Sequence, residues 1–118
     1  MNFETIQNGT VTHLKLEESR LDAAHAIQFK EGIRAVADEG AEYILLDMTK
    51  VEFMDSSGLG ALVSVMKYMG ADKKFEITGL TPMVEKVFKL TRMDEVFRVH
   101  RSVEDALQAA KNTEGQLS

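Results

Sequence analysis

The sequence contains no cysteine. A disulfide framework, a thiolate metal site and a cysteine nucleophile are therefore excluded. The chain also lacks the run of about 18 apolar residues that would predict a membrane-spanning helix. Its first residues, Met1 to Glu4, do not begin the basic and then apolar stretch that is typical of a signal peptide. We therefore expect a cytoplasmic protein that has no membrane partner.

Basic charge is also scarce, because 14 Lys and Arg residues face 19 Asp and Glu residues and leave a net charge of -5. Nucleic acids are bound through basic patches, and the one basic doublet, Lys73-Lys74, is too small to form one. We therefore expect no nucleic-acid partner. A hydrophobic content of 44% in 118 residues predicts one globular domain. We place it at residues 1–111 and expect residues 112–118 to fray, since they have too little apolar content to pack.

Hydrophobic periodicity predicts an α/β fold with the element order ββαβαβαβα. Asn8-Gly9 between two β-compatible runs indicates a hairpin, and residues 17–21 form a polar connection after it. The unbroken apolar run at 43–48 is typical of a strand that is covered on both faces. Alternation of strands and helices implies a mixed, mostly parallel sheet with helices packed against it. The predicted strands are 3–7, 10–16, 43–48, 74–79 and 96–99, and the predicted helices are 23–38, 57–69, 82–90 and 103–111.

One stretch stands out at a strand-to-helix junction, namely residues 55–60 with the sequence Asp-Ser-Ser-Gly-Leu-Gly. The start of a helix presents free backbone N–H groups and a positive dipole end, so hydroxyls there are well placed to carry a phosphate. In the helix that follows we expect a buried stripe opposite a face of small residues. The stripe is Leu59, Leu62, Val63 and Met66, and the small face is Gly58, Gly60, Ala61 and Ser64.

This stretch lacks residues that known kinds of enzyme site would need. A dinucleotide fingerprint would need a third glycine, a P-loop would need a lysine after the glycines, and a serine hydrolase would need a Gly-x-Ser-x-Gly elbow. The three histidines, His13, His25 and His100, are far apart in sequence and show no metal-ligand spacing. We therefore expect no catalytic residue, no metal and no cofactor.

Three aspartates and one methionine have two possible roles each. Asp22, Asp47 and Asp55 each follow an apolar segment, and open α/β sheets place their sites at the carboxyl ends of strands. Asp22 is either the N-cap of the helix at 23–38 or a site residue. Turn chemistry is favoured for Asp47 and a site role for Asp55, beside the serines. Met54 is either a core residue or part of an exposed contact face.

Residues 55–60, after the segment 45–54, resemble the signature of STAS domains, and most of all the stand-alone anti-sigma factor antagonists of bacteria. The resemblance covers about residues 3–110. In that family the first serine of the motif is phosphorylated by a partner kinase that is also the anti-sigma factor, and a serine phosphatase resets the protein. The resemblance therefore implies that Ser56 is the phosphosite, with Ser57 as the alternative acceptor. The unphosphorylated form would sequester the kinase and release a sigma factor or another regulator.

The resemblance also implies a contact surface for the partner. Family members carry an acid near the phosphosite, and Asp22 matches it. The expected partner-binding residues are Asp22, Met54, Asp55, Ser57, Gly58, Leu59 and Gly60. One departure is Ser19, where the family usually has a glycine, so the loop before Asp22 is expected to differ in shape. The alternative function is a non-switching STAS adaptor subunit of a transport or signalling assembly.

Overall fold

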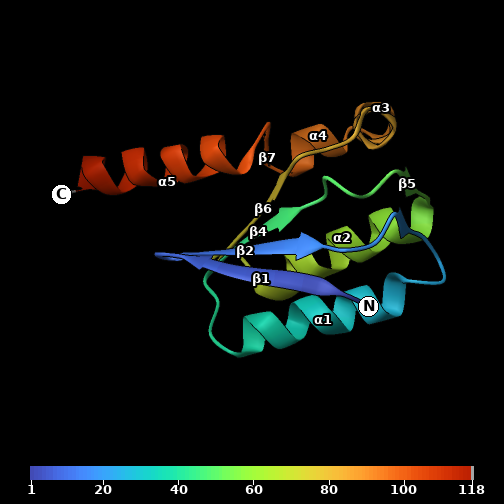
Figure 1. Ribbon diagram of the computed structural model, residues 1–118, viewed down its shortest axis with the longest axis horizontal. Coiled ribbons are helices and arrows are strands. Elements are labelled where there is room, and N and C mark those ends of the chain that lie inside the picture. The colour runs from blue at the N-terminus through green and yellow to red at the C-terminus, as the bar shows by residue number, and fades with distance from the viewer. Residues whose placement is uncertain (118) are drawn as a thin grey trace.

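A computed structural model describes the backbone of residues 1–117 and the side chains of residues 1–112. Strands and helices alternate along the chain (Figure 1). The strands are β1 (Phe3–Asn8), β2 (Val11–Leu16), β3 (Arg20–Leu21), β4 (Tyr43–Asp47), β5 (Phe53–Met54), β6 (Lys74–Thr78) and β7 (Val99–His100). The helices are α1 (Ala26–Asp38), α2 (Ser56–Met69), α3 (Pro82–Thr91), α4 (Met93–Val96) and α5 (Val103–Leu117).

The main sheet has five strands in the order β1-β2-β4-β6-β7. β1 pairs antiparallel with β2, and the pairings β2–β4, β4–β6 and β6–β7 are all parallel. The predicted mixed, mostly parallel sheet is therefore confirmed. The hairpin loop is Gly9-Thr10 rather than Asn8-Gly9, since Asn8 still pairs with Val11, and Gly9 has a φ of 60°. This is a backbone conformation that glycine adopts without steric cost.

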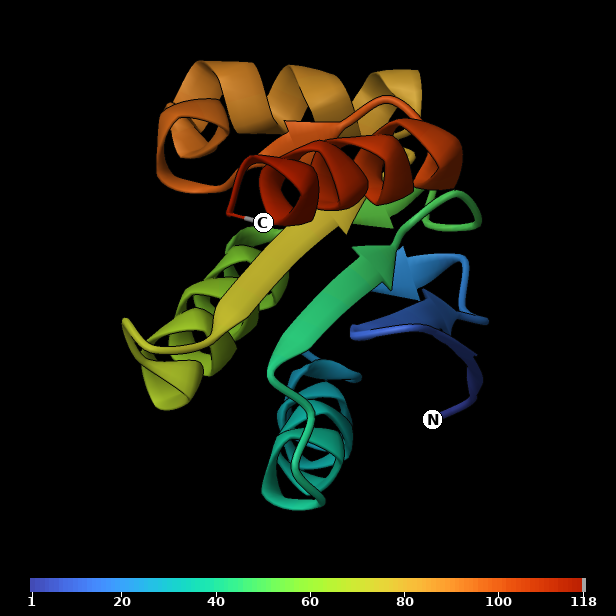
Figure 2. The ribbon, with the colours of Figure 1, turned by 90° about the vertical axis from the view of Figure 1, so that its left-hand side faces the viewer.

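Helices cover both faces of this sheet, which explains the unbroken apolar run of β4. All five β4 residues are buried. Ile44 and Leu46 belong to one apolar cluster, shared with α1, α2 and α3, whereas Tyr43 and Leu45 belong to another with Ala106 of α5. Successive side chains of a strand point to opposite faces, so one strand contributes to both clusters. Figures 1 and 2 show α1 and α2 on one side of the sheet and α5 on the other.

A second, two-stranded sheet was not predicted. β3 and β5 run parallel, with Arg20 opposite Phe53 and Leu21 opposite Met54. The sequence assigned residues 17–21 to a polar connection, yet the Leu21 side chain is fully buried. That assignment is wrong at its last two residues, because β3 is tied to a segment more than 30 residues later by a pairing that leaves no local pattern.

Two helix predictions need correction. α1 begins at Ala26 rather than Ala23. The buried residues of α2 are Gly58, Ala61, Leu62, Val65 and Met69, whereas Leu59, Val63 and Met66 of the predicted stripe pack against the core but are only partly buried. The buried side is displaced around the helix from the predicted one because the β3 backbone lies against the first turn. α4 follows α3 directly and was not predicted.

The last helix is longer than predicted. Its backbone continues past Lys111 to Leu117, and no proline interrupts its hydrogen bonds. The predicted fraying of residues 112–118 stays a prediction, because Ser118 and the side chains after Asn112 lie outside the described residues. Within the described part of the chain, no helix is both long and apolar enough to cross a membrane.

Candidate functional site

Asp55 organises the junction between β5 and α2. It is the N-cap of α2, and its Oδ1 accepts a hydrogen bond from the Gly58 N–H at 3.0 Å. Its Oδ2 accepts from the Ala23 N–H at 3.3 Å. The carboxylate therefore caps the helix and at the same time fixes the loop that follows β3. This brings Asp22, predicted as a site residue, next to the serine motif.

Ser56 and Ser57 are exposed in the first turn of α2, with Ser56 as the first helical residue. The first N–H groups of a helix have no partner inside the helix, and the dipole there favours negative charge. No hydrogen bond joins a histidine to either serine among the described residues, so neither hydroxyl is held by a base in this structure. The arrangement suits a serine that accepts a phosphate rather than one that attacks a substrate.

The two glycines of the motif have different surroundings. A Cβ on Gly58 would collide with the carbonyl oxygen of Leu21, so this position must be glycine for β3 to lie against α2. Nothing lies within 4 Å of a Cβ on Gly60, which is exposed. Glycine in a helix interior costs about 1 kcal/mol relative to alanine, and no packing contact at Gly60 requires it. Gly58 is structural, whereas Gly60 leaves the exposed side of α2 flat.

Asp22 is not a helix cap. Its Oδ1 lies 2.6 Å from His25 Nδ1, and its Oδ2 accepts a hydrogen bond from Arg20 Nε at 3.1 Å. The hydrogen bonds from His25 and then Arg20 hold the pKa of the Asp22 carboxyl below its usual value. The N-cap position of α1 is taken by His25, without a side-chain cap. The N-cap interpretation is wrong because His25 and Arg20 engage both carboxylate oxygens.

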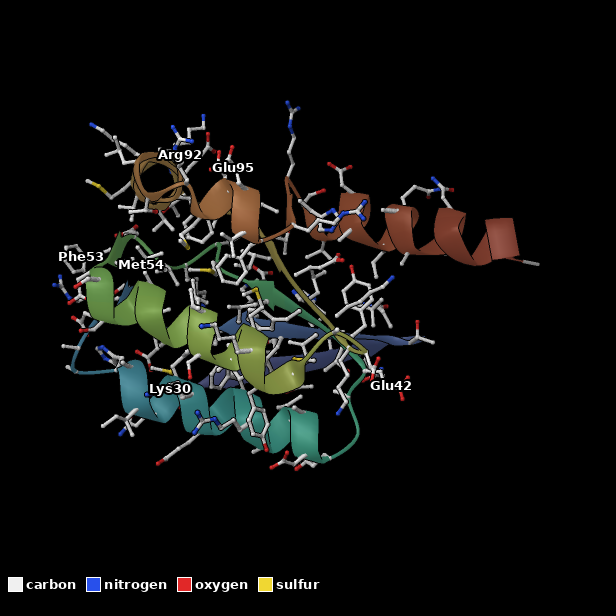
Figure 3. All side chains as sticks on the ribbon, turned by 180° about the vertical axis from the view of Figure 1, so that it is seen from behind. Lys30, Glu42, Phe53, Met54, Arg92 and Glu95 are labelled. Atoms are coloured by element: carbon white, nitrogen blue, oxygen red, sulfur yellow. The ribbon has the colours of Figure 1, made fainter. Side chains whose placement is uncertain are left out.

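The apolar residue exposed beside the motif is Phe53 rather than Met54. Met54 is 5% exposed and belongs to the core, whereas Phe53 is 37% exposed. This corrects the interpretation of Met54 as part of an exposed contact face. Figure 3 shows both residues at the end of the molecule where α2 begins. The guanidinium of Arg20 lies 4.2 Å from the centre of the Phe53 ring. Sequence reasoning missed Phe53 and Arg20, since β3–β5 pairing was not foreseen.

The departure at Ser19 does not distort the backbone. Arg92 is the only non-glycine residue with a positive φ among the described residues, so Ser19 needs no glycine-like conformation. Its carbonyl oxygen accepts hydrogen bonds from the N–H groups of Glu52 at 2.8 Å and Phe53 at 3.2 Å. The segment before Asp22 is therefore anchored to the segment before the motif.

The remaining histidines and Asp47 are structural and lie away from the serines. His13 Nε2 is 2.8 Å from Asp47 Oδ2, and both side chains are buried. Asp47 Oδ1 accepts from the Thr49 backbone and hydroxyl, which confirms turn chemistry. His100 pairs with Glu76 at 2.7 Å. Within the described residues, no group of three or more His, Asp or Glu side chains is arranged to hold a metal.

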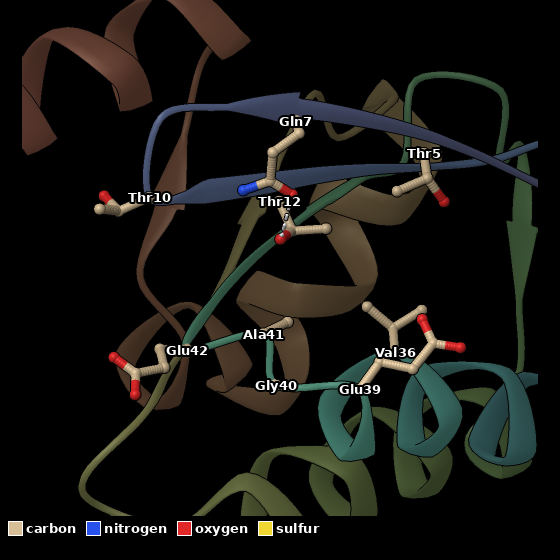
Figure 4. Close-up of a pocket in the computed structure, with 9 residues that line it drawn as sticks. All are labelled: Thr5, Gln7, Thr10, Thr12, Val36, Glu39, Gly40, Ala41 and Glu42. Atoms are coloured by element: carbon tan, nitrogen blue, oxygen red, sulfur yellow. Dashed lines mark hydrogen bonds between the residues drawn. The ribbon is translucent and has the colours of Figure 1, made fainter.

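A cavity of about 450 Å³ lies at the other end of the fold (Figure 4). It is found between the β1–β2 hairpin and the loop that leads from α1 into β4. Its lining is mainly polar and includes Thr5, Thr12 and Glu42. None of its residues belongs to the serine motif, which follows the carboxyl ends of the strands. The candidate site is therefore the exposed corner around Ser56, not this cavity.

Comparison with known proteins gives a consistent result. The family model described as "STAS domain" matches residues 2–106. A relative named "Anti-sigma-B factor antagonist", from Staphylococcus epidermidis, is 26% identical over 105 residues, which are 88% of this chain and 96% of the relative.

Two solved structures show the same fold. The crystal structure of an anti-sigma factor antagonist from Mycobacterium paratuberculosis has a TM-score of 0.83 and 23% identity and covers 93% of both chains. The Bacillus cell fate determinant SpoIIAA in its phosphorylated form has a TM-score of 0.66 and 21% identity. That match covers 92% of this chain and 99% of SpoIIAA. At these identities the structural likeness supports the fold alone.

Proposed function

The chain belongs to the STAS domain family, and on that premise we propose that it is an anti-sigma factor antagonist switched by phosphorylation. In this proposal the unphosphorylated form sequesters an anti-sigma factor serine/threonine kinase and so releases a sigma factor or another regulator. The kinase phosphorylates Ser56, the complex dissociates, and a serine phosphatase restores the binding form. The chain itself acts by binding and catalyses no reaction.

The observation that carries the proposal is the position of Ser56. Its side chain is exposed at the first residue of α2, directly after a helix cap that is already supplied by Asp55. The Ser56 hydroxyl is therefore not needed to cap the helix, and phosphorylation would not disturb the cap. A phosphate adds about -1.5 to -2 charges, and a helix N-terminus stabilises such a charge by about 0.3–1 kcal/mol. The fold is expected to tolerate the modification.

A partner packed over the same corner would not tolerate it. The exposed Phe53 ring and the open surface at Gly60 lie on either side of the serines in sequence and offer an apolar contact and a flat helix face. One extra charge about 6 Å from a like charge costs about 3 kcal/mol at an effective dielectric near 20. That corresponds to about a hundredfold loss of affinity. Phosphorylation would thus break the interface and leave the domain folded.

The test is to find the kinase and the phosphorylated residue together. The protein is incubated with ATP and a lysate of its native host, and the phosphate is located by mass spectrometry. Ser56→Ala serves as bait for the kinase, with Ser57→Ala as the matched control, since Ser57 is also exposed. We expect phosphate on Ser56 in the wild type and in Ser57→Ala, and a trapped kinase on Ser56→Ala.

Other outcomes would replace the proposal. Phosphate on Ser57 alone would show that Ser57, and not Ser56, is the phosphorylated residue of the switch. A stable partner without any phosphorylation would favour a non-switching adaptor subunit. Turnover of a small molecule by the purified chain would contradict both binding functions.

A further inference from the structure

A guanidinium and an imidazole are gathered on one carboxylate beside the serine motif. Arg20 and His25 engage the two oxygens of Asp22 at 3.1 and 2.6 Å. The Asp22 side chain is only 15% exposed, whereas those of Arg20 and His25 are 54% and 30% exposed. Arg20 and His25 are therefore more accessible to a ligand than the carboxylate that they contact.

This cluster lies within reach of Ser56. Leu21 pairs with Met54, and the Ala23 N–H donates to Asp55 Oδ2, so Asp22 stands beside Asp55. Asp22 and Asp55 each directly follow the last paired residues of β3 and β5, and Ser56 comes next in the chain, so Asp22 and Ser56 share one corner of the fold. The Arg20 side chain bonds to Asp22, which places its guanidinium at the same corner.

Arg20 has donors to spare. Only its Nε donates to Asp22, and no acceptor for its Nη groups is found among the described residues. The guanidinium plane is held against the Phe53 ring, at 4.2 Å from the ring centre. A guanidinium that is fixed in this way presents the planar pair of N–H groups that binds phosphate bidentately. A neutral residue in place of Arg20 would offer no positive charge to the phosphate.

The acidic side chains next to Ser56 favour a cationic counterpart for a phosphate there. Asp22 and Asp55 are both acidic and both adjacent to the corner, and the first turn of α2 has no charged side chain. A phosphate would be a third anionic group there. We propose that Arg20 and His25 form a clamp that receives the phosphate of phosphorylated Ser56, with Asp22 as the positioning residue that orients both. The clamp rests on the proposed phosphorylation of Ser56.

The test uses full-length protein with phosphoserine installed at position 56 by genetic code expansion, so that no kinase is needed. The second ionisation of the phosphate is followed by ³¹P NMR against pH. We expect the midpoint in the wild type to lie about half a unit to one unit below that in Arg20→Gln, because a nearby cation favours the dianion. His25→Asn should also raise the midpoint. Arg101→Gln, which removes an exposed charge directly after β7, is the matched control and should equal the wild type, since no contact joins Arg101 to the motif among the described residues.

Asp22→Asn tests the positioning role. It keeps the shape of the side chain but weakens the hydrogen bonds to Arg20 and His25, so the midpoint should move part of the way toward that of Arg20→Gln. A merely structural aspartate would leave the midpoint unchanged in a variant that remains folded by circular dichroism. Arg20→Lys, which keeps the charge without the planar fork, should recover only part of the wild-type shift.

The result that overturns the clamp is the same midpoint in the wild type, Arg20→Gln and Arg101→Gln. This failure is distinct from failure of the switch. If phosphoserine at position 56 abolishes kinase binding without any Arg20-dependent shift, the switch stands and the clamp is wrong. If the shift is present but kinase binding is unchanged, the clamp stands and the proposed function is wrong.

Discussion

The backbone carbonyl oxygen of Leu21 occupies the space that a Cβ on Gly58 would need. This contact joins β3 to the first turn of α2 and so sets the position of Asp22 relative to Ser56. A side chain at position 58 can be accommodated only by moving backbone, because the obstacle is a carbonyl group rather than the end of a flexible side chain.

Gly58→Ala is therefore expected to destabilise the domain. Overpacking costs about 1–3 kcal/mol, and a clash with backbone belongs at the upper end of that range, above the gain in helix propensity of about 1 kcal/mol. Gly60→Ala is the matched control, since a Cβ there meets nothing within 4 Å. It should stabilise the domain by up to about 1 kcal/mol. Urea unfolding of the two variants measures both effects, and equal changes would contradict this account of the motif.

A second prediction concerns a permanent charge at the phosphosite. Ser56→Asp places one negative charge at the N-terminus of α2, so the free energy of unfolding should stay within about 1 kcal/mol of the wild type. Affinity for the kinase should fall by about a hundredfold, because the added charge repels a like charge across the interface. Ser57→Asp provides the comparison at the neighbouring exposed serine. Thermal unfolding and calorimetry of binding test this, and an unfolded Ser56→Asp variant would show that Ser56 has a structural role.

Much of the main sheet was predictable because its signals are local. The apolar run of β4, the hairpin and the start of α3 at Pro82 each depend on a few consecutive residues. β3 was missed because its two residues are stabilised by pairing with a distant segment. The buried side of α2 was missed for a related reason. A hydrophobicity pattern places Leu59 inward, whereas contact with the β3 backbone selects the side that carries Gly58 and Ala61.

The motif itself was found from the sequence, but its neighbours were not. Asp22 and His25 stand at i,i+3, which is a helical spacing, but Arg20 lay in the segment predicted as a polar connection, so the sequence did not indicate that both would contact Asp22. Phe53 was likewise hidden by the reading of Met54 as the contact residue. Which of two adjacent apolar residues faces solvent was decided by strand pairing, with Met54 opposite the buried Leu21.

A third prediction concerns the stability of the domain at low pH, which depends on the Asp47 carboxyl. Burial alone would raise the pKa of Asp47, but hydrogen bonds from Thr49 and His13 outweigh it and hold the pKa below its usual value. A carboxyl with a lower pKa in the folded state adds stability above its unfolded pKa of about 3.9, and this stability is lost as the pH falls through the folded value. The domain should therefore lose stability below about pH 4.

Asp47→Asn should reduce the loss of folding stability below about pH 4. At neutral pH we expect it to destabilise the domain by about 1–3 kcal/mol, since the buried His13 loses a charged acceptor. Its stability should then change less on acidification than that of the wild type. Asp72→Asn, in an exposed turn, is the control. Urea unfolding at a series of pH values measures the slopes, and parallel curves for wild type and Asp47→Asn would contradict the assignment.

The last prediction separates stability from binding at two neighbouring residues. Met54 is 5% exposed and packed in the core, so Met54→Ala should cost about 2–5 kcal/mol of unfolding free energy. Phe53 is 37% exposed and stacks on Arg20, so Phe53→Ala should cost about 1 kcal/mol at most.

For partner binding, Phe53 should matter more than Met54, because an exposed aromatic residue is typical of an interface hot spot. Phe53→Ala should weaken binding to the captured kinase by at least about tenfold, measured by calorimetry below the unfolding transition of both variants. If Phe53→Ala binds like the wild type, the partner does not dock on the β5 side of the corner, and the contact surface must lie along α2.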